Sequence, residues 1–347
     1  MGKNAEKFTY TKSPDKNDMP DFRTTLKAQK APFSISHQDH LLCLGSCFAQ
    51  HIGTRLQNNH FSTVLNPFGI LYNPASIAHA LQQLLRQKKM GTSDLFQNQG
   101  IWYSFAHHGH FSDPDPELAL QKINEASQEG QQQLQKTTRL LITLGTAQVF
   151  QYKASGQIVA NCHKLPAKEF RELEMSATEI TQLLSPIFQQ LSSLQPDLQI
   201  ILSLSPIRHL RNGLINNQRS KAKLLSAIHD LVDRHDWVSY FPAYEIVLDD
   251  LRDYRFYEAD LIHPNDQAIN YIWTFFGDTF FDEPSKNLNK QLAQLQKAIT
   301  HRPFHPQSEA HQQFIQQQLQ NIQKMERQYP FLDLKTEKQD FEQQLVK

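Results

Sequence analysis

The sequence predicts an α/β protein in which a mostly parallel β-sheet lies between two layers of helices. Two observations support this fold class. Short apolar runs that end at glycine or proline recur along the chain, and segments with helical periodicity separate them. Strands that alternate with helices of this length are typical of βαβ units, whose sheet is covered on both faces.

The first expected strand is the apolar run HLLCLG at residues 40–45, which stops at a glycine. Continuous apolar runs of this length are typical of buried parallel strands. A helix is expected directly afterwards, over residues 47–57, because Phe48, Ile52 and Leu56 recur every four residues. The sequence therefore predicts a sharp strand-to-helix turn at residues 45–47.

The same alternation continues along the chain. Further strands are expected at residues 61–67, 139–145, 198–206 and 237–243. Helices are expected between them at residues 74–88, 117–135, 177–194 and 220–234. Residues 100–112 and 147–163 alternate with period two, which predicts two antiparallel hairpins added to the sheet.

The two ends of the chain differ in character from the middle. Residues 1–37 are polar and without periodicity, which predicts an extended arm, and residues 38–284 then form the main domain. Residues 285–347 are rich in Gln and show helical periodicity over 286–300 and 309–328, which predicts a helical extension. These amphipathic helices either pack on the domain or form a coiled coil or another partner-binding helix, for instance in a homo-oligomer.

The composition excludes several classes of protein. The 347-residue chain has 35 Lys and Arg against 35 Asp and Glu, and this zero net charge argues against a nucleic-acid partner. No apolar run approaches the roughly 20 residues of a membrane-spanning helix. The N-terminus has no apolar segment typical of a signal peptide, and three cysteines are too few for a disulfide framework. A soluble cytoplasmic protein is expected.

Ligands of an open parallel sheet bind at the carboxyl ends of its strands. Gly45, Ser46 and Cys47 follow the first strand, at a helix N-terminus that leaves backbone N–H groups unpaired and stabilises a thiolate. Cys47 and Ser46 are therefore candidate nucleophiles. The structural alternative is that Gly45 makes the turn, Ser46 caps the helix and Cys47 is a small buried side chain.

Asp260 and His263 supply the expected partners of a nucleophile. An Asp three residues before a His can hydrogen-bond the imidazole and fix its tautomer. The His then acts as general base toward the nucleophile and as general acid toward the leaving group. A surface Asp and a surface His without a catalytic role are the alternative.

Other polar residues at the strand ends are candidates for lining the same pocket. They are Gly45, Asn66, Gly69, Gly145, Thr146, Asn161, His163, His209 and Arg255. Arg208 and the two histidines are candidates for binding a polar or anionic substrate, and Arg255 for holding a carboxylate or phosphate. The alternatives are hydrogen bonds of the histidines to loop backbone and pairing of Arg255 with nearby carboxylates. Cys162 is expected to face the same pocket as Cys47.

Together these residues resemble the SGNH, or GDSL-like, hydrolase superfamily, which implies a three-layer, flavodoxin-like α/β/α fold. The strings LGSCFAQHIG, NPFGILYNP, LITLGTAQVF, NCHKLP, SPIRH and DLRDYRFYEADLIHPN resemble the GSCFA family of that superfamily. The resemblance covers residues 38–275 approximately. It implies a fold and a mechanism but no particular reaction.

The chain departs from the superfamily pattern at two places. Aligned on the turn glycine, Ser46 occupies the usual Asp position and Cys47 the nucleophile position, so Cys47 is preferred and Ser46 remains open. Gly145-Thr146 lacks the Asn that supplies an oxyanion donor in the superfamily. Asn161, Thr146 or Gln148 are possible replacements, as is the segment that holds Asn66 and Gly69.

The leading hypothesis is an acyl-ester hydrolase or acyltransferase that forms a covalent acyl-enzyme and uses no cofactor. Its expected substrate is an acyl ester of a small molecule or a carbohydrate. A second hypothesis is a non-catalytic module that binds a carbohydrate or another polymer on the same scaffold. A third is a zinc protein. Its ligands would be Cys47, Cys162, His163, His209 and His263.

Overall fold

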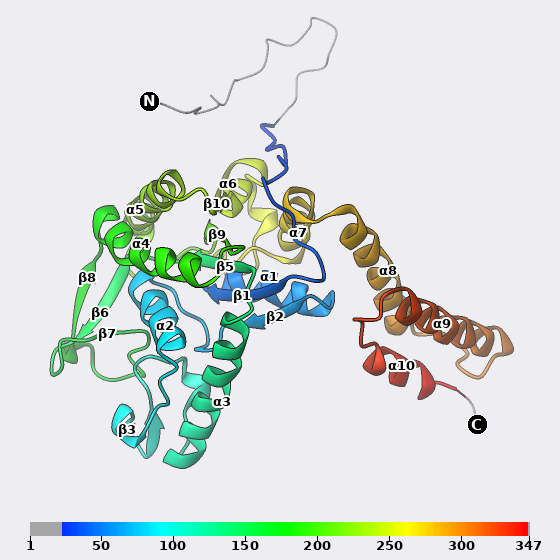
Figure 1. The fold of residues 1–347 in the computed structure, drawn as a ribbon, viewed down its shortest axis with the longest axis horizontal. Coiled ribbons are helices and arrows are strands. Elements are labelled where there is room, and N and C mark those ends of the chain that lie inside the picture. Colours follow the sequence, from blue (N-terminus) through cyan, green and yellow to red (C-terminus); the bar gives the residue numbers. More distant parts are fainter. Residues whose placement is uncertain (1–22, 346–347) are drawn as a thin grey trace, which may run out of the picture.

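Five parallel strands form the central sheet of the protein in a computed structural model that describes residues 23–345 (Figure 1). The strand order is β10-β9-β5-β1-β2, and every neighbouring pair is parallel. In chain order this is the 2-1-3-4-5 arrangement of flavodoxin-like sheets. The predicted α/β fold class is confirmed.

The elements have the following bounds. The strands of the central sheet are β1 (His40–Gly45), β2 (Ser62–Leu65), β5 (Arg139–Leu144), β9 (Gln199–Leu204) and β10 (Val238–Phe241). The helices are α1 (Cys47–Asn58), α2 (Pro74–Arg86), α3 (Pro116–Leu134), α4 (Ala177–Leu194), α5 (Gly213–Arg234), α6 (Ala243–Glu245), α7 (Asp266–Phe280), α8 (Glu283–Thr300), α9 (Glu309–Gln328) and α10 (Lys335–Glu342).

Alternating residues of β1 are buried in two apolar clusters, one on each face of the sheet. Leu42 and Leu44 pack on one face of the sheet with buried residues of α2, α4 and α5. Leu41 and Cys43 pack on the other face with buried residues of α1 and α7. The sheet therefore lies between two helical layers, as the apolar runs predict, and its carboxyl edge stays open for a site.

The two expected hairpins form, but neither joins the central sheet. The first is β3 (Phe96–Asn98) with β4 (Ile101–Tyr103), so the prediction of a hairpin over 100–112 was displaced along the chain. The second is β6 (Gln148–Tyr152) with β7 (Ile158–Val159), and an unpredicted strand, β8 (Phe170–Glu174), makes it a separate three-stranded sheet. These small sheets extend beside the domain (Figure 1).

The arm predicted at residues 1–37 lies partly outside the described residues, which begin at residue 23. Its last part is fixed to the domain. Ile35 is fully buried, forms a β-bridge with Phe281 and belongs to the same core half as α1 and α7. This segment is thus a structural part of the domain rather than a free arm.

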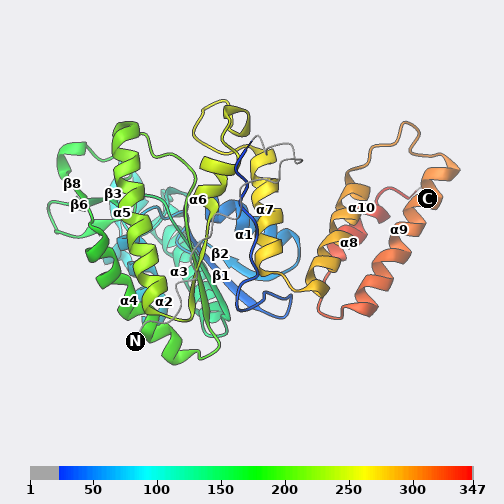
Figure 2. The same ribbon diagram turned by 90° about the horizontal axis from the view of Figure 1, so that it is seen from above.

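Helices α8, α9 and α10 form a unit with its own apolar core, which includes Leu288, Ile315 and Phe341. Figure 2 shows this unit at one side of the main domain. His60 contacts the Glu337 carboxylate at 3.1 Å, and His37 hydrogen-bonds the Ser285 hydroxyl at 3.0 Å, so polar contacts attach the unit. Among residues 23–345, no helix has the length and apolar character needed to cross a membrane.

A substitution at Gly45 tests the close approach of β1 to β5. Its φ is +141°, and a Cβ there would lie 2.3 Å from the Thr143 carbonyl oxygen of the neighbouring strand. Gly45→Ala should therefore lower the free energy of unfolding by about 2–5 kcal/mol, through backbone strain and overlap.

Gly156 is the matched control, because its φ is +74° but no atom lies within 4 Å of an added Cβ. Gly156→Ala should cost only about 1 kcal/mol. Chemical denaturation of both variants measures the difference, and equal losses would contradict the close approach of β1 to β5.

Candidate active site

The turn at residues 45–47 lies where the sheet changes its winding direction. β1 pairs with β2 on one side and with β5 on the other, so the point where strand order reverses falls between β1 and β5. Open α/β sheets bind ligands at this point, beyond the carboxyl ends of the strands. Gly45-Ser46-Cys47 follows β1 there, and Gly145-Thr146 follows β5.

Ser46 and Cys47 have different roles at this turn. Ser46 is the N-cap of α1, is 2% exposed, and its hydroxyl accepts a hydrogen bond from the Phe48 N–H at 3.2 Å. Cys47 begins α1, is half-buried, and its Sγ lies 3.6 Å from the Tyr72 hydroxyl. The thiol is thus the accessible group of the pair, whereas the hydroxyl is committed to capping the helix.

Tyr72 was not among the residues that the sequence singled out. It follows the block NPFGIL, and its phenol ring is partly exposed beside the Cys47 thiol. Burial raises the pKa of Tyr72, and the neighbouring Cys47 raises it further. The phenol therefore keeps its proton at neutral pH and is available as a hydrogen-bond donor.

Residues 66–73 cross the ends of β1 and β5 and occupy most backbone groups that were candidates for an oxyanion hole. The Gly45 N–H donates to Asn66 Oδ1 at 2.9 Å, and the Gly69 N–H donates to the Asn66 carbonyl at 2.6 Å. The Gly145 and Thr146 N–H groups both donate to the Tyr72 carbonyl, at 2.8 and 2.9 Å. These four residues shape the turn rather than offer free donors.

Among the remaining candidates for the missing donor, the side chains of Asn66 and Thr146 are engaged. Asn66 Nδ2 donates to Gln50 Oε1, and Asn161 Oδ1 accepts from the His163 N–H. The Thr146 hydroxyl contacts the Ser220 hydroxyl at 3.1 Å. Gln148 is 8% exposed and its backbone N–H donates to the Thr146 hydroxyl, whereas its buried side-chain Oε1 has no hydrogen-bond partner. The Cys47 N–H, first in α1, has no acceptor within the helix.

Asp260 and His263 form a hydrogen-bonded pair. Asp260 Oδ2 lies 2.6 Å from His263 Nδ1, and Asp260 Oδ1 accepts the N–H groups of Ile262 and His263. Hydrogen bonds from the backbone and imidazole of His263, and from the Ile262 N–H, lower the pKa of Asp260 to about 2. The carboxylate therefore stays ionised and holds Nδ1 of His263, which leaves Nε2 as the ring nitrogen that does not contact Asp260.

His51 of α1 is within electrostatic range of His263. It lies one turn after Cys47, so both side chains project from the same side of α1. Burial lowers the pKa of His51, and the positive charges of Arg55 and His263 lower it further. The loop that holds the pair lies against the segment that follows β9, since the Arg208 N–H donates to the Ile262 carbonyl at 3.4 Å.

Arg208 holds the loop that carries this pair. Its guanidinium donates to the Leu261 carbonyl at 2.8 Å and lies over the Tyr257 ring, 4.3 Å from the centroid. Leu261 has a φ of +59°, which a branched side chain seldom adopts, so the loop needs such a contact to keep its shape. Arg208, expected to bind substrate, instead positions the loop.

Lys221 of α5 hydrogen-bonds the residues that follow β5 and β9. Its ammonium group donates to the carbonyls of Gly145 and Ser205, at 2.8 and 2.6 Å, and the residue is 2% exposed. Among residues 23–345 no carboxylate pairs with it. Burial lowers the pKa of Lys221 to about 7.

Several expected pocket residues lie elsewhere or bind other groups. His163 is buried, contacts the Ser104 carbonyl at 2.8 Å and packs on Tyr103. Cys162 lines a cavity of about 320 Å³ whose lining does not include Cys47, and a pocket shared by the two thiols stays a prediction. Arg255 is exposed and 3.9 Å from Asp253, as its structural alternative expected.

His209 remains at the edge of the strand ends. Its N–H donates to Asn217 Oδ1 of α5 at 2.9 Å, and burial, then Lys221 and Arg211, lower the pKa of its imidazole. The zinc hypothesis needs this residue to meet two cysteines and two other histidines. Among the described residues, no three His, Cys, Asp or Glu side chains are grouped to hold a metal ion, so the expected convergence was wrong.

Fold and site together define an α/β protein with a half-buried thiol at the switch point of its sheet and an Asp–His pair nearby. The model of the GSCFA family matches residues 40–276, which is more than half of the chain. The chain therefore belongs to the GSCFA family. The model for the C-terminal domain of GSCFA domain proteins matches residues 292–347. No curated protein and no solved structure matches the chain.

The contact of Arg208 with the loop predicts that Arg208→Met loosens residues 258–264 without unfolding the domain. Amide hydrogen exchange of that loop should rise about ten-fold or more, because the loss of a charge-assisted hydrogen bond costs about 1.5–3 kcal/mol. Arg252→Met is the control, since Arg252 pairs only with Asp249 and Leu248 of its own segment. Equal protection in both variants would refute the role of Arg208.

The buried Lys221 predicts a pH dependence of stability. Its pKa is about 7 in the folded protein against the ordinary lysine value of 10.5, so the unfolded chain binds more protons between these values. Stability of the wild type should therefore rise with pH across that window by about 1.4 kcal/mol per pH unit relative to Lys221→Met. Urea denaturation of both proteins from pH 6 to 10 measures it. Parallel curves would contradict a buried, unpaired Lys221.

Proposed function

We propose that the protein is an acyl-ester hydrolase or acyltransferase that uses Cys47 as its nucleophile. The observation that carries the proposal is the position of the thiol, half-exposed at a helix N-terminus and 3.6 Å from the Tyr72 phenol. The hydrogen bond between Asp260 and His263 supports their role as the orienting acid and the base of this proposal. A thiol with such neighbours suits covalent catalysis. Membership of the SGNH superfamily is part of this proposal.

His263 moves the protons of the reaction. Nε2 of His263 takes the proton of the Cys47 thiol, and the sulfur attacks the ester carbonyl carbon. The tetrahedral intermediate collapses, the bond to the alcohol oxygen breaks, and His263 returns the proton to the departing alcohol. In a hydrolase, water then attacks the carbonyl carbon of the thioester; in a transferase, an acceptor alcohol attacks it. His263 takes the proton of the attacking group and returns it to the departing sulfur of Cys47. Asp260 stabilises the imidazolium in both steps.

The oxyanion needs donors that the fold has left free. The Cys47 N–H is one, because the first N–H of a helix has no intrahelical acceptor. The Tyr72 hydroxyl is the second, since it lies beside the sulfur and stays protonated. In this proposal Tyr72 replaces the Asn that Gly145-Thr146 lacks, while the N–H groups of those residues hold Tyr72 in place.

A panel of p-nitrophenyl and carbohydrate acyl esters tests the proposal with single substitutions. Cys47→Ala and His263→Ala should abolish turnover, and Tyr72→Phe should lower kcat by about 10²–10³, as expected for an oxyanion donor. Ser46→Ala should keep activity and lose about 1 kcal/mol of stability, because it removes a helix cap.

Cys162→Ala is the matched control for the thiol. An activated ester probe followed by mass spectrometry should find the acyl group on Cys47. An adduct on Ser46, or turnover that survives both Cys47→Ala and His263→Ala, would overturn the mechanism. Binding of a carbohydrate polymer with no turnover of any ester would favour the non-catalytic alternative.

A further inference from the structure

A hollow on the C-terminal unit lies away from the candidate active site. It has a volume of about 1060 Å³ and is lined by α8, α9 and the loop between them, with no residue of α10. We call it the C-terminal groove. α10 packs against both α8 and α9, and Figure 2 shows it between them. The groove is the part of this helix pair that α10 leaves uncovered.

The floor of the groove is apolar and follows the helical repeat. Leu295 of α8 and Met325 of α9 are almost fully buried beneath it, and Phe314 lines it as well. Along α9 the lining residues recur every three or four positions over the length of the helix. A surface of this form fits a further helix laid along the two, whose apolar side chains enter at matching intervals.

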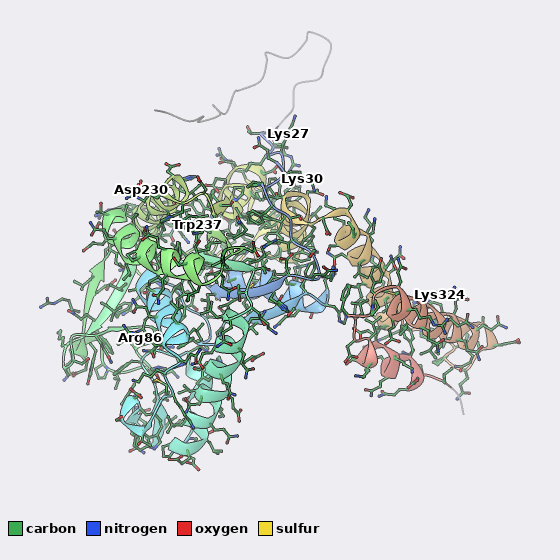
Figure 3. The ribbon with its side chains drawn as sticks, in the orientation of Figure 1. Lys27, Lys30, Arg86, Asp230, Trp237 and Lys324 are labelled. Carbon is green, nitrogen blue, oxygen red and sulfur yellow. The ribbon has the colours of Figure 1, made fainter. Side chains whose placement is uncertain are left out.

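All charged side chains that line the C-terminal groove are basic. Lys297, Arg302 and Lys324 line it together with three histidines, and no Asp or Glu contributes to the lining. Lys324 lies on α9, where Figure 3 labels it. Within the described part of the chain, none of these three cations forms an ion pair. This excess of positive charge occurs in a chain whose net charge is zero.

Phe304 stands at the mouth of the groove. It lies in the loop between α8 and α9, lines the groove and is 99% exposed. An aromatic side chain left in water costs hydration free energy, and such residues are frequent anchors of protein interfaces. The groove thus presents an aromatic anchor, an apolar floor and unpaired cations.

We propose that the C-terminal groove binds an acidic amphipathic helix of a partner protein. The apolar face of that helix would cover the floor, and its carboxylates would pair with Lys297, Arg302 and Lys324. The volume slightly exceeds the roughly 300–1,000 Å³ of small-molecule sites, which favours a polypeptide segment. The proposal does not depend on the activity proposed for Cys47.

A displayed library of 20-residue helical peptides tests the proposal on the full-length protein. One face of each peptide carries fixed leucines, and the other positions vary among Glu, Lys, Gln and Ser. Selection should enrich Glu over Lys beside the leucine face. The selected peptides should bind at least about ten-fold more tightly than versions with Lys in place of Glu, measured by fluorescence anisotropy.

Substitutions locate the site. The triple change Lys297→Glu, Arg302→Glu and Lys324→Glu should reverse the preference to Lys peptides, whereas Lys290→Glu, an exposed residue of α8 outside the groove, should not. Phe304→Ala should weaken binding about ten-fold, and Leu194→Ala, equally on the surface but on α4, should leave it unchanged.

Three results would overturn the proposal. The first is a selection without enrichment of acidic peptides, or binding that the triple variant retains. The second is tight binding of single-stranded RNA that the triple variant loses, which would make a nucleic acid the occupant. The third is self-association in analytical ultracentrifugation that Phe304→Ala abolishes, which would make a second copy of the chain the occupant.

Discussion

One short segment, residues 66–73, holds the carboxyl edge of the sheet together. Asn66 and Leu71 bond both backbone groups of Gly45, and the Tyr72 carbonyl accepts the N–H groups of Gly145 and Thr146. Phe68 of the same segment stacks on His107, and its carbonyl accepts the His108 N–H, which attaches the chain that follows the first hairpin. The segment thereby joins β1, β5 and this part of the chain at the place where the thiol lies.

These hydrogen bonds decide which backbone groups can take part in catalysis and which only hold the structure. A backbone N–H that already has a protein acceptor cannot also stabilise a developing negative charge without breaking that bond. At Gly45, Gly69, Gly145 and Thr146 the acceptors are in place. The groups left near the sulfur are a helix N–H and a phenol. Cys43 is excluded as a nucleophile, because full burial raises the pKa of its thiol to about 12.

The sequence predicted the sheet well because buried parallel strands are continuous apolar runs, and all five lie within the expected ranges. It missed α7, whose many aromatic residues have weak helical propensity, and α10, where Phe341 is the one fully buried apolar residue. α5 begins seven residues before the expected position, since exposed Leu214 and Ile215 break the amphipathic pattern there.

For the site, sequence reasoning found the residues that follow strands but not those that reach it from elsewhere. Tyr72 and Lys221 come from a loop and from the middle of α5, so no spacing relates them to Cys47 or Gly145. A Lys in an expected helix gives no signal of burial, because Lys is normally exposed. The Asp–His pair was visible because its members are three positions apart in the sequence, which is a local relation.

Net charge and local charge give different information about this protein. Equal numbers of acidic and basic residues argue against a generally basic surface, and that argument holds for the molecule as a whole. The pairing of these charges is uneven, however. Among the described residues, the hydrogen bonds of the Lys221 ammonium go to two carbonyls, and the three cations of the C-terminal groove have no carboxylate partner. A buried cation shared by two strand ends stabilises a shape, whereas exposed cations over an apolar floor favour an acidic occupant. The zero net charge therefore gives no sign of these two roles of positive charge. They can be told apart only from the positions of the residues in the folded protein.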